Sequence, residues 1–197
     1  MRIRHTFTLF ALFSAIIGIV FVGFTLSTIS RLQTTSHTVD TVGAIRQDAL
    51  IQAAYVRRLV EEQRAGSRET AAAQELVGAL ARNNEQMDRT LKELTANDGD
   101  AGYAQVSNSR MDTAEASVMQ LWPAFRDAVN GVTERRAGRR NSEFIQGHVL
   151  ELVRRLDELM AVYRRAYHHA ATQLWWWGTG LGIFLVMDLS VVAILLF

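Results

Sequence analysis

Hydrophobic residues are concentrated at the two ends of the chain. Residues 7–29 contain no charged side chain and consist mostly of Phe, Leu, Ile, Val and Ala, while residues 174–197 contain a single charge, Asp188. Each run has about the ~20 residues that an α-helix needs to cross the hydrocarbon core of a bilayer. We therefore expect a transmembrane helix at each end and a water-exposed domain between them, over residues 30–173.

The segment between the two apolar runs has the pattern of α-helices. Its apolar residues recur every three or four positions, and the chain has one proline. Gly-containing polar stretches of the kind that end helices interrupt this pattern at residues 65–67, 97–102 and 136–141. They leave four helices: one that ends near Arg64, and others over about 68–95, about 103–135, and from about Ser142 onward. Similar lengths and short loops predict an all-α fold, a membrane-anchored antiparallel four-helix bundle.

Two of these helices show distinct packing faces. In the fourth helix, one heptad stripe consists of Val149, Leu152, Leu156, Leu159, Tyr163 and Ala166. The first helix has two neighbouring stripes, which are Val42, Ile45, Ala49, Val56 and Leu59, and beside them Val39, Gly43, Arg46, Leu50 and Ala53. One stripe is enough for the core of a monomer. The second stripe predicts a homodimer in which the first helix faces its copy, and the alternative is one broad core face.

Charges near the first apolar run predict the orientation in the membrane. Arg2 and Arg4 precede the run, so residues 1–6 are expected to form a cytoplasmic tail. The run is longer than the apolar region of a signal peptide and no small-x-small cleavage site follows it, which indicates an uncleaved anchor. Two spans then place residues 30–173 outside the cytoplasm, which in a bacterium is the periplasmic side of the inner membrane. The aromatic run Trp175–Trp177 is typical of the outer membrane interface.

The composition excludes several classes of function. Between the apolar runs lie 19 of the 21 Lys and Arg residues and 19 of the 20 Asp and Glu residues, whereas a nucleic-acid surface would need a basic stripe. The chain has no cysteine, so disulfides and thiolate zinc sites are excluded. His168 and His169 point to different sides of a helix, and His148 lies about five turns away, so no metal site is expected. No catalytic carboxylate pair, nucleophile motif or phosphate loop is present, so we expect neither a cofactor nor enzyme activity in this chain.

The candidate ligand site lies in the first helix, at Asp40, Gly43, Arg46 and Gln47. Gly43 costs about 1 kcal/mol relative to Ala inside a helix, and it allows close backbone approach at an interface. Arg46 lies on the same face, so two copies of Arg46 would meet at a two-fold seam and would need an anion between them. A guanidinium fits a planar oxyanion such as nitrate, nitrite or a carboxylate. The alternative is a surface arginine paired with Asp40 or another acidic neighbour.

This stretch resembles a family signature. Gly43-x-x-Arg46, about 17 residues past the first span, is similar to the motif in the periplasmic sensor domains of nitrate/nitrite sensor kinases and of type IV pilus methyl-accepting chemoreceptors. Residues 121–126 resemble the Trp-centred segment of the pilus-type domain. Those domains usually have Ala, Asn and Arg where this chain has Val42, Asp40 and Ile51. The resemblance implies a sensor of nitrate, nitrite or another small anion, and an amine, an amino acid or a partner protein remains open.

Two further sites have unusual residues. Pro123 lies inside the third predicted helix, where it removes a backbone hydrogen bond and is expected to kink the helix. Its neighbour Trp122 either shapes a pocket or, as is commoner, belongs to the core. In the second predicted span, Asp188 is a costly carboxylate in hydrocarbon, at about the depth of Ser14 in the first span. We hypothesise that Asp188 hydrogen-bonds to Ser14 or to its own copy across a dimer.

These features together predict a transmembrane input module of a sensor histidine kinase in a two-component system, or of a chemoreceptor. Binding near Arg46 would shift the first helix against the fourth, and both are expected to continue into the spans. The alternative is a stand-alone two-pass membrane protein that acts as an assembly or regulatory subunit of a membrane complex. A reading frame that continues beyond Phe197 into an output domain would distinguish the two.

Overall fold

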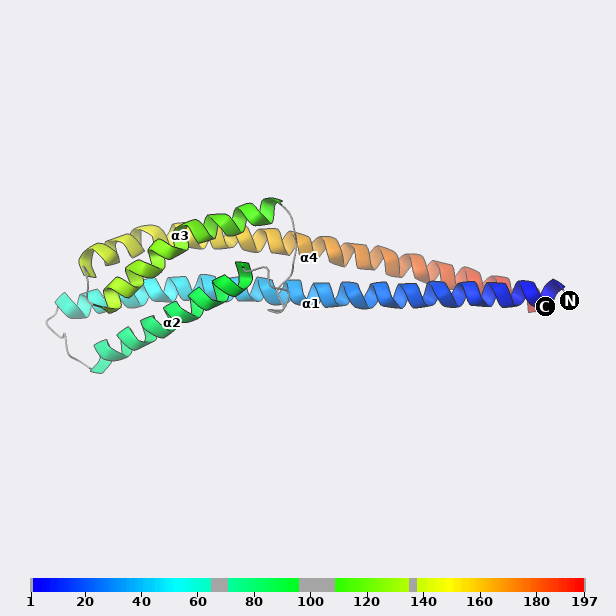
Figure 1. Ribbon diagram of the computed structural model, residues 1–197, viewed down its shortest axis with the longest axis horizontal. Helices are drawn as coiled ribbons and strands as arrows, with labels where there is room; N and C mark the ends of the chain where they lie inside the picture. The colour runs from blue at the N-terminus through cyan, green and yellow to red at the C-terminus, as the bar shows by residue number, and fades with distance from the viewer. Residues whose placement is uncertain (1, 65–70, 96–108, 135–137, 197) are drawn as a thin grey trace. The chain divides into compact units, whose positions relative to one another are not determined.

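The computed structural model describes residues 2–64, 71–95, 109–134 and 138–196. Within these ranges the regular structure is entirely α-helical, which confirms the predicted all-α class. Figure 1 shows the four helices in chain order: α1 (Arg2–Arg64), α2 (Ala71–Thr95), α3 (Ser109–Thr133) and α4 (Gly138–Leu196). The chain divides into two compact units. One consists of Met1–Thr34 with Ala166–Phe197, and the other consists of Thr35–Arg165.

Within residues 35–165 the helices form a bundle, and side-chain hydrogen bonds join neighbouring helices. α1 and α4 are antiparallel, because Arg46 reaches Asp157 while Gln146 donates to the backbone carbonyl of Ala53. Comparable bonds join the other pairs of neighbours: Gln52–Asn83 for α1 and α2, Asn84–Asn130 for α2 and α3, and Tyr163–Glu115 for α3 and α4. Each helix therefore contacts the helices before and after it around the bundle.

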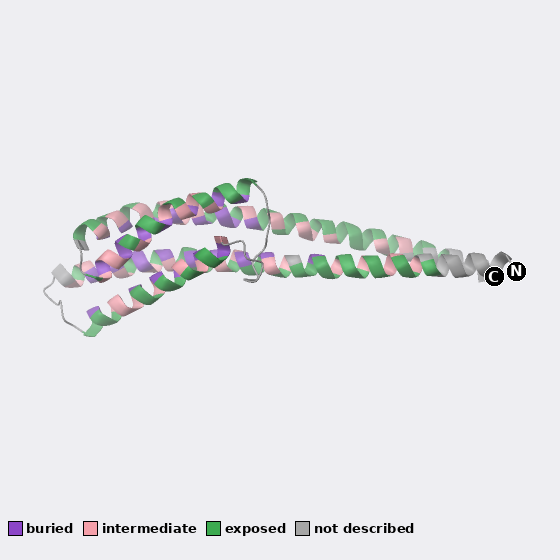
Figure 2. Ribbon diagram, viewed as in Figure 1, coloured by how far each residue is buried: buried purple, intermediate pink, exposed green. Residues whose placement is uncertain are grey.

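The predicted apolar stripes form the core of this bundle. In α4, the stripe from Val149 to Tyr163 has exposed fractions of 0–7 %, and in α1 the stripe from Val42 to Leu59 has exposed fractions of 0–3 %. Figure 2 shows the buried positions on the facing sides of the helices and the exposed positions on their outer sides. Both stripes are thus confirmed as core-forming. Ala166, the last residue of the predicted α4 stripe, is half-buried and belongs to the other unit.

The second stripe of α1 divides between core and surface. Ala53 is 7 % exposed and Val39 packs against the core, as the alternative of one broad core face predicts. Leu50, in contrast, is 41 % exposed. A Cβ atom placed on Gly43 would meet no other atom within 4 Å, so no close backbone approach occurs there within one chain. Gly43, Arg46 and Leu50 therefore remain at the surface of the bundle.

The ends of α1 and α2 agree with the predicted breaks and the start of α4 does not, while the predicted start of the second helix near residue 68 lies outside the described residues. α1 ends at Arg64 and α2 ends at Thr95, as expected. α4 begins at Gly138 rather than near Ser142, so that prediction was wrong by about one turn. In this first turn, Nε of Arg139 lies 2.9 Å from Oε1 of Glu143, an exposed pair of the kind that contributes about 0.2–0.5 kcal/mol. The predicted start of the third helix near residue 103 lies outside the described residues.

The other unit combines the beginning of α1 with the end of α4. In the part of the chain that the structure describes, one helical stretch, Ser14–Glu62, contains a window long and apolar enough to cross a membrane, and 6 % of that window is buried. In α4 the large hydrophobic residues of this unit that are more than half exposed are Trp175, Trp176, Trp177, Ile183, Val186 and Met187. Several later side chains, including those of residues 191–197, lie outside the described part, so the second span stays a prediction.

A leucine pair on α4 tests the assignment of core and surface. Leu156 is fully buried and Leu150 is 72 % exposed. We expect Leu156→Ala to lower the free energy of unfolding by about 2–5 kcal/mol, because it leaves a cavity among packed side chains. Leu150→Ala should change it by no more than about 0.5 kcal/mol. Urea unfolding of the full chain in detergent, followed by far-UV circular dichroism, measures both; equal losses would contradict the assignment.

Candidate functional site

Arg46 lies on the outer side of α1 and forms an ion pair with α4. Its Nε is 3.1 Å from Oδ1 of Asp157, and the two side chains are 44 % and 49 % exposed. The pair matches the alternative of a surface arginine with an acidic neighbour, except that the neighbour comes from α4 and not from Asp40. A guanidinium carries five N–H donors, and in this ion pair the nitrogen near the carboxylate is Nε. The geometry therefore leaves room for a second acceptor at Arg46.

The other predicted ligand residues surround Arg46 on the same helix. Gly43, one turn earlier, is half-buried, whereas Asp40 and Gln47 are exposed. The four residues form a surface patch on the bundle, which we call the Arg46 face. Within a single chain the Arg46 face offers a ligand one guanidinium on an open surface. A second chain packed on this face would enclose it.

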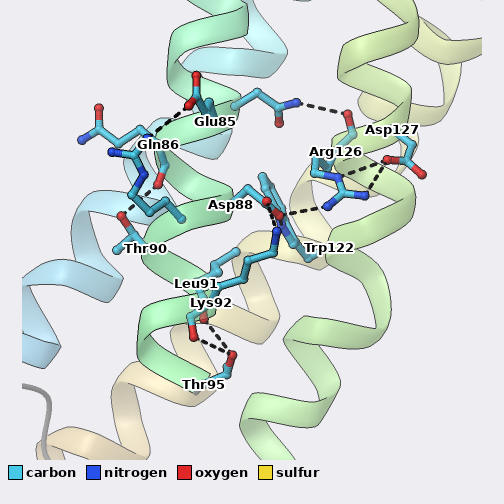
Figure 3. Close-up of polar contacts among 12 residues, drawn as sticks. Glu85, Gln86, Asp88, Thr90, Leu91, Lys92, Thr95, Trp122, Arg126 and Asp127 are labelled. Carbon is cyan, nitrogen blue, oxygen red and sulfur yellow. Dashed lines mark hydrogen bonds and ion pairs between the residues drawn. The ribbon is translucent and has the colours of Figure 1, made fainter. Parts of the chain in front are cut away.

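Trp122 belongs to the core and supports a buried carboxylate (Figure 3). Its ring is 1 % exposed, and its Nε1 donates to Oδ1 of Asp88 over 2.9 Å. The same oxygen accepts from Arg126 over 3.1 Å, and the other oxygen is 2.6 Å from Nζ of Lys92. Pro123 lies inside the continuous helix α3 and is exposed. Of the two interpretations of Trp122, its burial therefore favours the core residue.

Asp88 stays ionised because donors surround it. Burial alone raises the pKa of its carboxyl, but hydrogen bonds from Lys92, Trp122 and Arg126 outweigh this effect and lower the pKa to about 2. The carboxylate side chain is 18 % exposed. It is thus a mostly buried charge whose partners come from both α2 and α3, and it ties these two helices together.

The polar centre around Asp88 was not among the candidate residues drawn from the sequence. A local signal existed, because Asp88 and Lys92 are four residues apart, as are Trp122 and Arg126, and such pairs share a helix face. That spacing indicates neighbours within one helix only. The contact between the two pairs depends on how α2 and α3 pack, which no local pattern specifies.

Glu115 and Tyr163 form a second polar contact, between α3 and α4. The buried Tyr163 hydroxyl donates to Oε1 of Glu115 over 3.0 Å. Burial raises the pKa of Glu115, the hydrogen bond from Tyr163 lowers it, and the charge of Asp112 raises it, so that the net shift is upward. Burial also raises the pKa of the Tyr163 hydroxyl. At neutral pH the hydroxyl therefore stays protonated and serves as the donor.

A layer of amide side chains crosses the core between α1, α2 and α3. Gln52 is 0 % exposed and donates to Asn83 over 2.6 Å, while Asn84 is 3 % exposed and donates to Asn130 over 2.7 Å. The side-chain oxygens of Gln52 and Asn84 have no hydrogen-bond partner among the described residues. Buried amides cost stability, and in helical bundles they favour one register over others. The layer therefore favours specificity of packing over maximal stability.

The remaining predicted residues lie in the apolar unit. Ser14 is half-buried and takes part in a polar contact, whereas the side chain of Asp188 lies outside the described part of α4. The hydrogen bond between them consequently stays a prediction. Among the described residues, no group of three His, Asp or Glu side chains is placed to hold a metal ion.

Comparisons with models of protein families, with curated proteins and with solved structures found no match for this chain. The resemblance of the Gly43–Arg46 stretch to sensor domains thus stays an expectation from the sequence. Among the predicted ligand residues, Arg46 forms an ion pair that joins α1 to α4.

Replacing the buried carboxylate gives a test of the polar centre. We expect Asp88→Asn to lower stability at pH 7 by on the order of 1–2 kcal/mol, because three donors lose an ionised acceptor. The folded pKa, about 2, lies below the ordinary value of 3.8, so the contribution of Asp88 is complete above about pH 4 and is lost as the pH falls toward 2. The difference between wild type and variant should shrink over that range in urea titrations at several pH values.

Asp127→Asn is the matched control, because Asp127 also binds Arg126 but is 66 % exposed. Its effect should stay below about 1 kcal/mol, as for other exposed ion pairs. A loss as large as that of Asp88→Asn would show that the partners of Arg126, and not the burial of Asp88, determine the effect.

Proposed function

We propose that this chain is a transmembrane input module for signal transduction, which senses a small anion or a partner at the Arg46 face, outside the cytoplasm. The observation that carries the proposal is the half-exposed ion pair between Arg46 and Asp157. It joins α1 to α4, the two helices that contain the apolar runs 7–29 and 174–197. A ligand that acts on this pair acts on both helices with membrane-spanning character.

An anion would act by competing with Asp157 for the guanidinium of Arg46. Exposed ion pairs stabilise proteins by about 0–1 kcal/mol, so a bound oxyanion replaces the carboxylate at little cost. When the carboxylate of Asp157 is displaced, a polar link between α1 and α4 is lost. A small slide or rotation of one helix against the other then becomes easier, and such interface shifts are a known mode of switching.

A homodimer through α1 would complete the site. Gly43, Arg46 and Leu50 lie at the surface of the bundle, and Leu50 is a large aliphatic side chain with 41 % exposure. Packing α1 on its copy would cover Leu50 and bring the two Arg46 guanidinium groups toward each other. Their repulsion favours an oxyanion between them, such as nitrate, nitrite or a carboxylate. The chain would then serve a sensor kinase or chemoreceptor in the inner membrane, with its bundle in the periplasm.

The second candidate is a stand-alone two-pass subunit that regulates or assembles a membrane complex. It is favoured by Leu150, which is 72 % exposed on α4 and does not belong to the proposed α1 seam. An exposed leucine on a second helix suits a lateral contact with another protein. In this case Leu150→Asp would abolish co-purification of a partner, whereas the sensor would tolerate this change.

Calorimetric titration of the full chain in detergent with nitrate, nitrite and acetate tests the anion site. We expect binding heat with wild type and none with Arg46→Ala. Asp157→Asn removes the competing charge and should tighten binding by up to about fivefold, the equivalent of about 1 kcal/mol. Arg57→Ala is the control, since Arg57 is a more exposed arginine of α1 that pairs with Glu61. Unchanged binding in Arg46→Ala, or no heat with any anion, would reject the anion site and leave a partner as the signal.

The proposed seam is tested by adding a single methyl group. Gly43→Ala meets open space within one chain, so it should raise the stability of the bundle by up to about 1 kcal/mol. If the dimer seam lies at Gly43, the same methyl group separates the two backbones. The dimer is then weaker and should dissociate at a higher protein concentration than the wild-type dimer. Sedimentation equilibrium in detergent measures this change. Gly147→Ala on α4, which also meets open space, is the control; identical self-association of both variants and wild type would place the seam elsewhere or remove it.

A further inference from the structure

An apolar groove of about 430 Å³ lies within the unit formed by the two ends of the chain. α1 contributes Ile16, Val20 and Phe24 to its walls, and α4 contributes Trp177, Gly180 and Phe184. Among the described residues that line it, none is charged and none is Ser, Thr, Asn or Gln. Such a volume is typical of small-molecule sites.

Two aromatic side chains, Phe24 and Trp177, lie at one end of the groove. The rings of Phe24 and Trp177 are 5.4 Å apart, so these two residues lie at the same level of α1 and α4. From Phe24 to Ile16 the groove follows α1 for roughly 12 Å. Tryptophan is the residue typical of the membrane interface. The aromatic end therefore corresponds to the headgroup level, and the rest of the groove runs toward the hydrocarbon.

Neither water nor empty space suits this groove. A buried water needs two to four polar partners, and the one polar side-chain group of the lining residues is the indole N–H of Trp177. An empty groove would leave its lining atoms without contacts on one side, which loses dispersion energy. The occupant should be apolar and long enough to follow both helices.

The lining favours a flexible chain over a transmembrane helix. Helices associate in membranes where small residues let their backbones approach. Gly180 is the one small residue in the lining, and Gly178 and Gly182, which have the spacing of a helix-pairing motif, are not part of it. Outside the groove the same helices expose large apolar side chains, with Ile19 at 73 % and Val186 at 65 %. Both helices are thus surrounded by surface that suits lipid.

We propose that the groove binds one acyl chain of a phospholipid, with the headgroup beyond Trp177. One turn above Trp177 lies Gln173, whose amide is 3.3 Å from Nε2 of His169, and both side chains are exposed. They offer polar contacts at the height where a headgroup follows an acyl chain. The site rests on the proposed membrane-spanning arrangement of α1 and α4. The lipid bound between these helices would exchange more slowly than the lipids of the surrounding bilayer.

Photo-crosslinking tests the site in the full chain. The protein is reconstituted in vesicles of phosphatidylcholine and phosphatidylglycerol that carry a trace of phosphatidylglycerol with a diazirine on its acyl chain. We expect labelling to concentrate on groove residues such as Val20 and Phe184. Gly180→Leu fills the groove and should reduce this labelling at least fivefold. Gly178→Leu and Gly182→Leu add the same side chain to the same helix outside the groove and should leave it unchanged.

A second pair of variants guards against a defect specific to Gly180. Val20→Trp narrows the groove from the α1 side and should also reduce labelling, whereas Ile19 is not part of the lining and Ile19→Trp should not reduce it. If Ile19, Val20 and Val186 are labelled equally and Gly180→Leu does not change this labelling, the label reports general contact with bilayer lipid. This result would overturn the proposal. Crosslinks between two copies of the chain at the groove residues, in place of crosslinks to lipid, would identify a second copy as the occupant and would overturn the proposal as well.

Failure of the underlying topology gives a different result. A chain that is released from the vesicles by alkaline carbonate does not span the membrane, and both the proposed function and the lipid site then fall. A chain that resists carbonate but shows uniform labelling retains its proposed topology and loses only the lipid site.

Discussion

The packing of α1 against α4 is the contact on which the rest of the structure depends. These are the longest helices, with 63 and 59 residues, and each contributes to both compact units. In the bundle, each presents an apolar stripe to the core, and the pair is joined at the surface by the Arg46–Asp157 ion pair and the bond from Gln146 to Ala53. α2 and α3 complete the core that these stripes require. Without cysteine, this packing has to hold the domain together.

Polar groups in the bundle are compensated to different degrees, and the differences suggest different roles. Asp88 is surrounded by three donors, so a mostly buried charge becomes a link between α2 and α3. Gln52 and Asn84 are buried amides with one unpartnered oxygen each, which lowers stability and restricts the register. Arg46 and Asp157 are half-exposed, and their pair contributes little to stability. The weakest of these contacts is therefore the one best suited to exchange partners with a ligand.

The unit formed by the two ends of the chain exposes the apolar side chains that the bundle buries. In the bundle, large apolar side chains point inward, whereas in this unit many of them are exposed, including Ile19 at 73 % and the three tryptophans at 57–64 %. Such a surface is unfavourable in water and favourable in lipid. The same reasoning applies to the groove between the two helices, whose lining side chains are apolar apart from the indole N–H of Trp177.

Much of the fold followed from local pattern. Apolar residues at helical spacing predicted the buried stripes of α1 and α4, because the period of a helix alone places them on one face. The ends of α1 and α2 followed from polar stretches with glycine. The start of α4 did not, because a polar stretch with glycine indicates a break between helices and does not specify the residue at which the next helix begins. The second stripe of α1 allowed two interpretations. Spacing along the helix shows that Leu50 and Ala53 share a face, but it does not show how much of that face the neighbouring helices cover.

The sequence by itself determined the helical class, the apolar ends, the absence of cysteine and the faces that are buried. These properties depend on residue type and on a period of a few residues, so they can be read along the chain. Only the tertiary structure decided that Arg46 meets Asp157 and not Asp40, that Trp122 serves the carboxylate of Asp88, and that Phe24 and Trp177 close one end of a groove. Each of these contacts joins residues more than 30 positions apart. Their meeting depends on the relative height and rotation of packed helices, which the combined packing of the chain establishes and no single helix encodes.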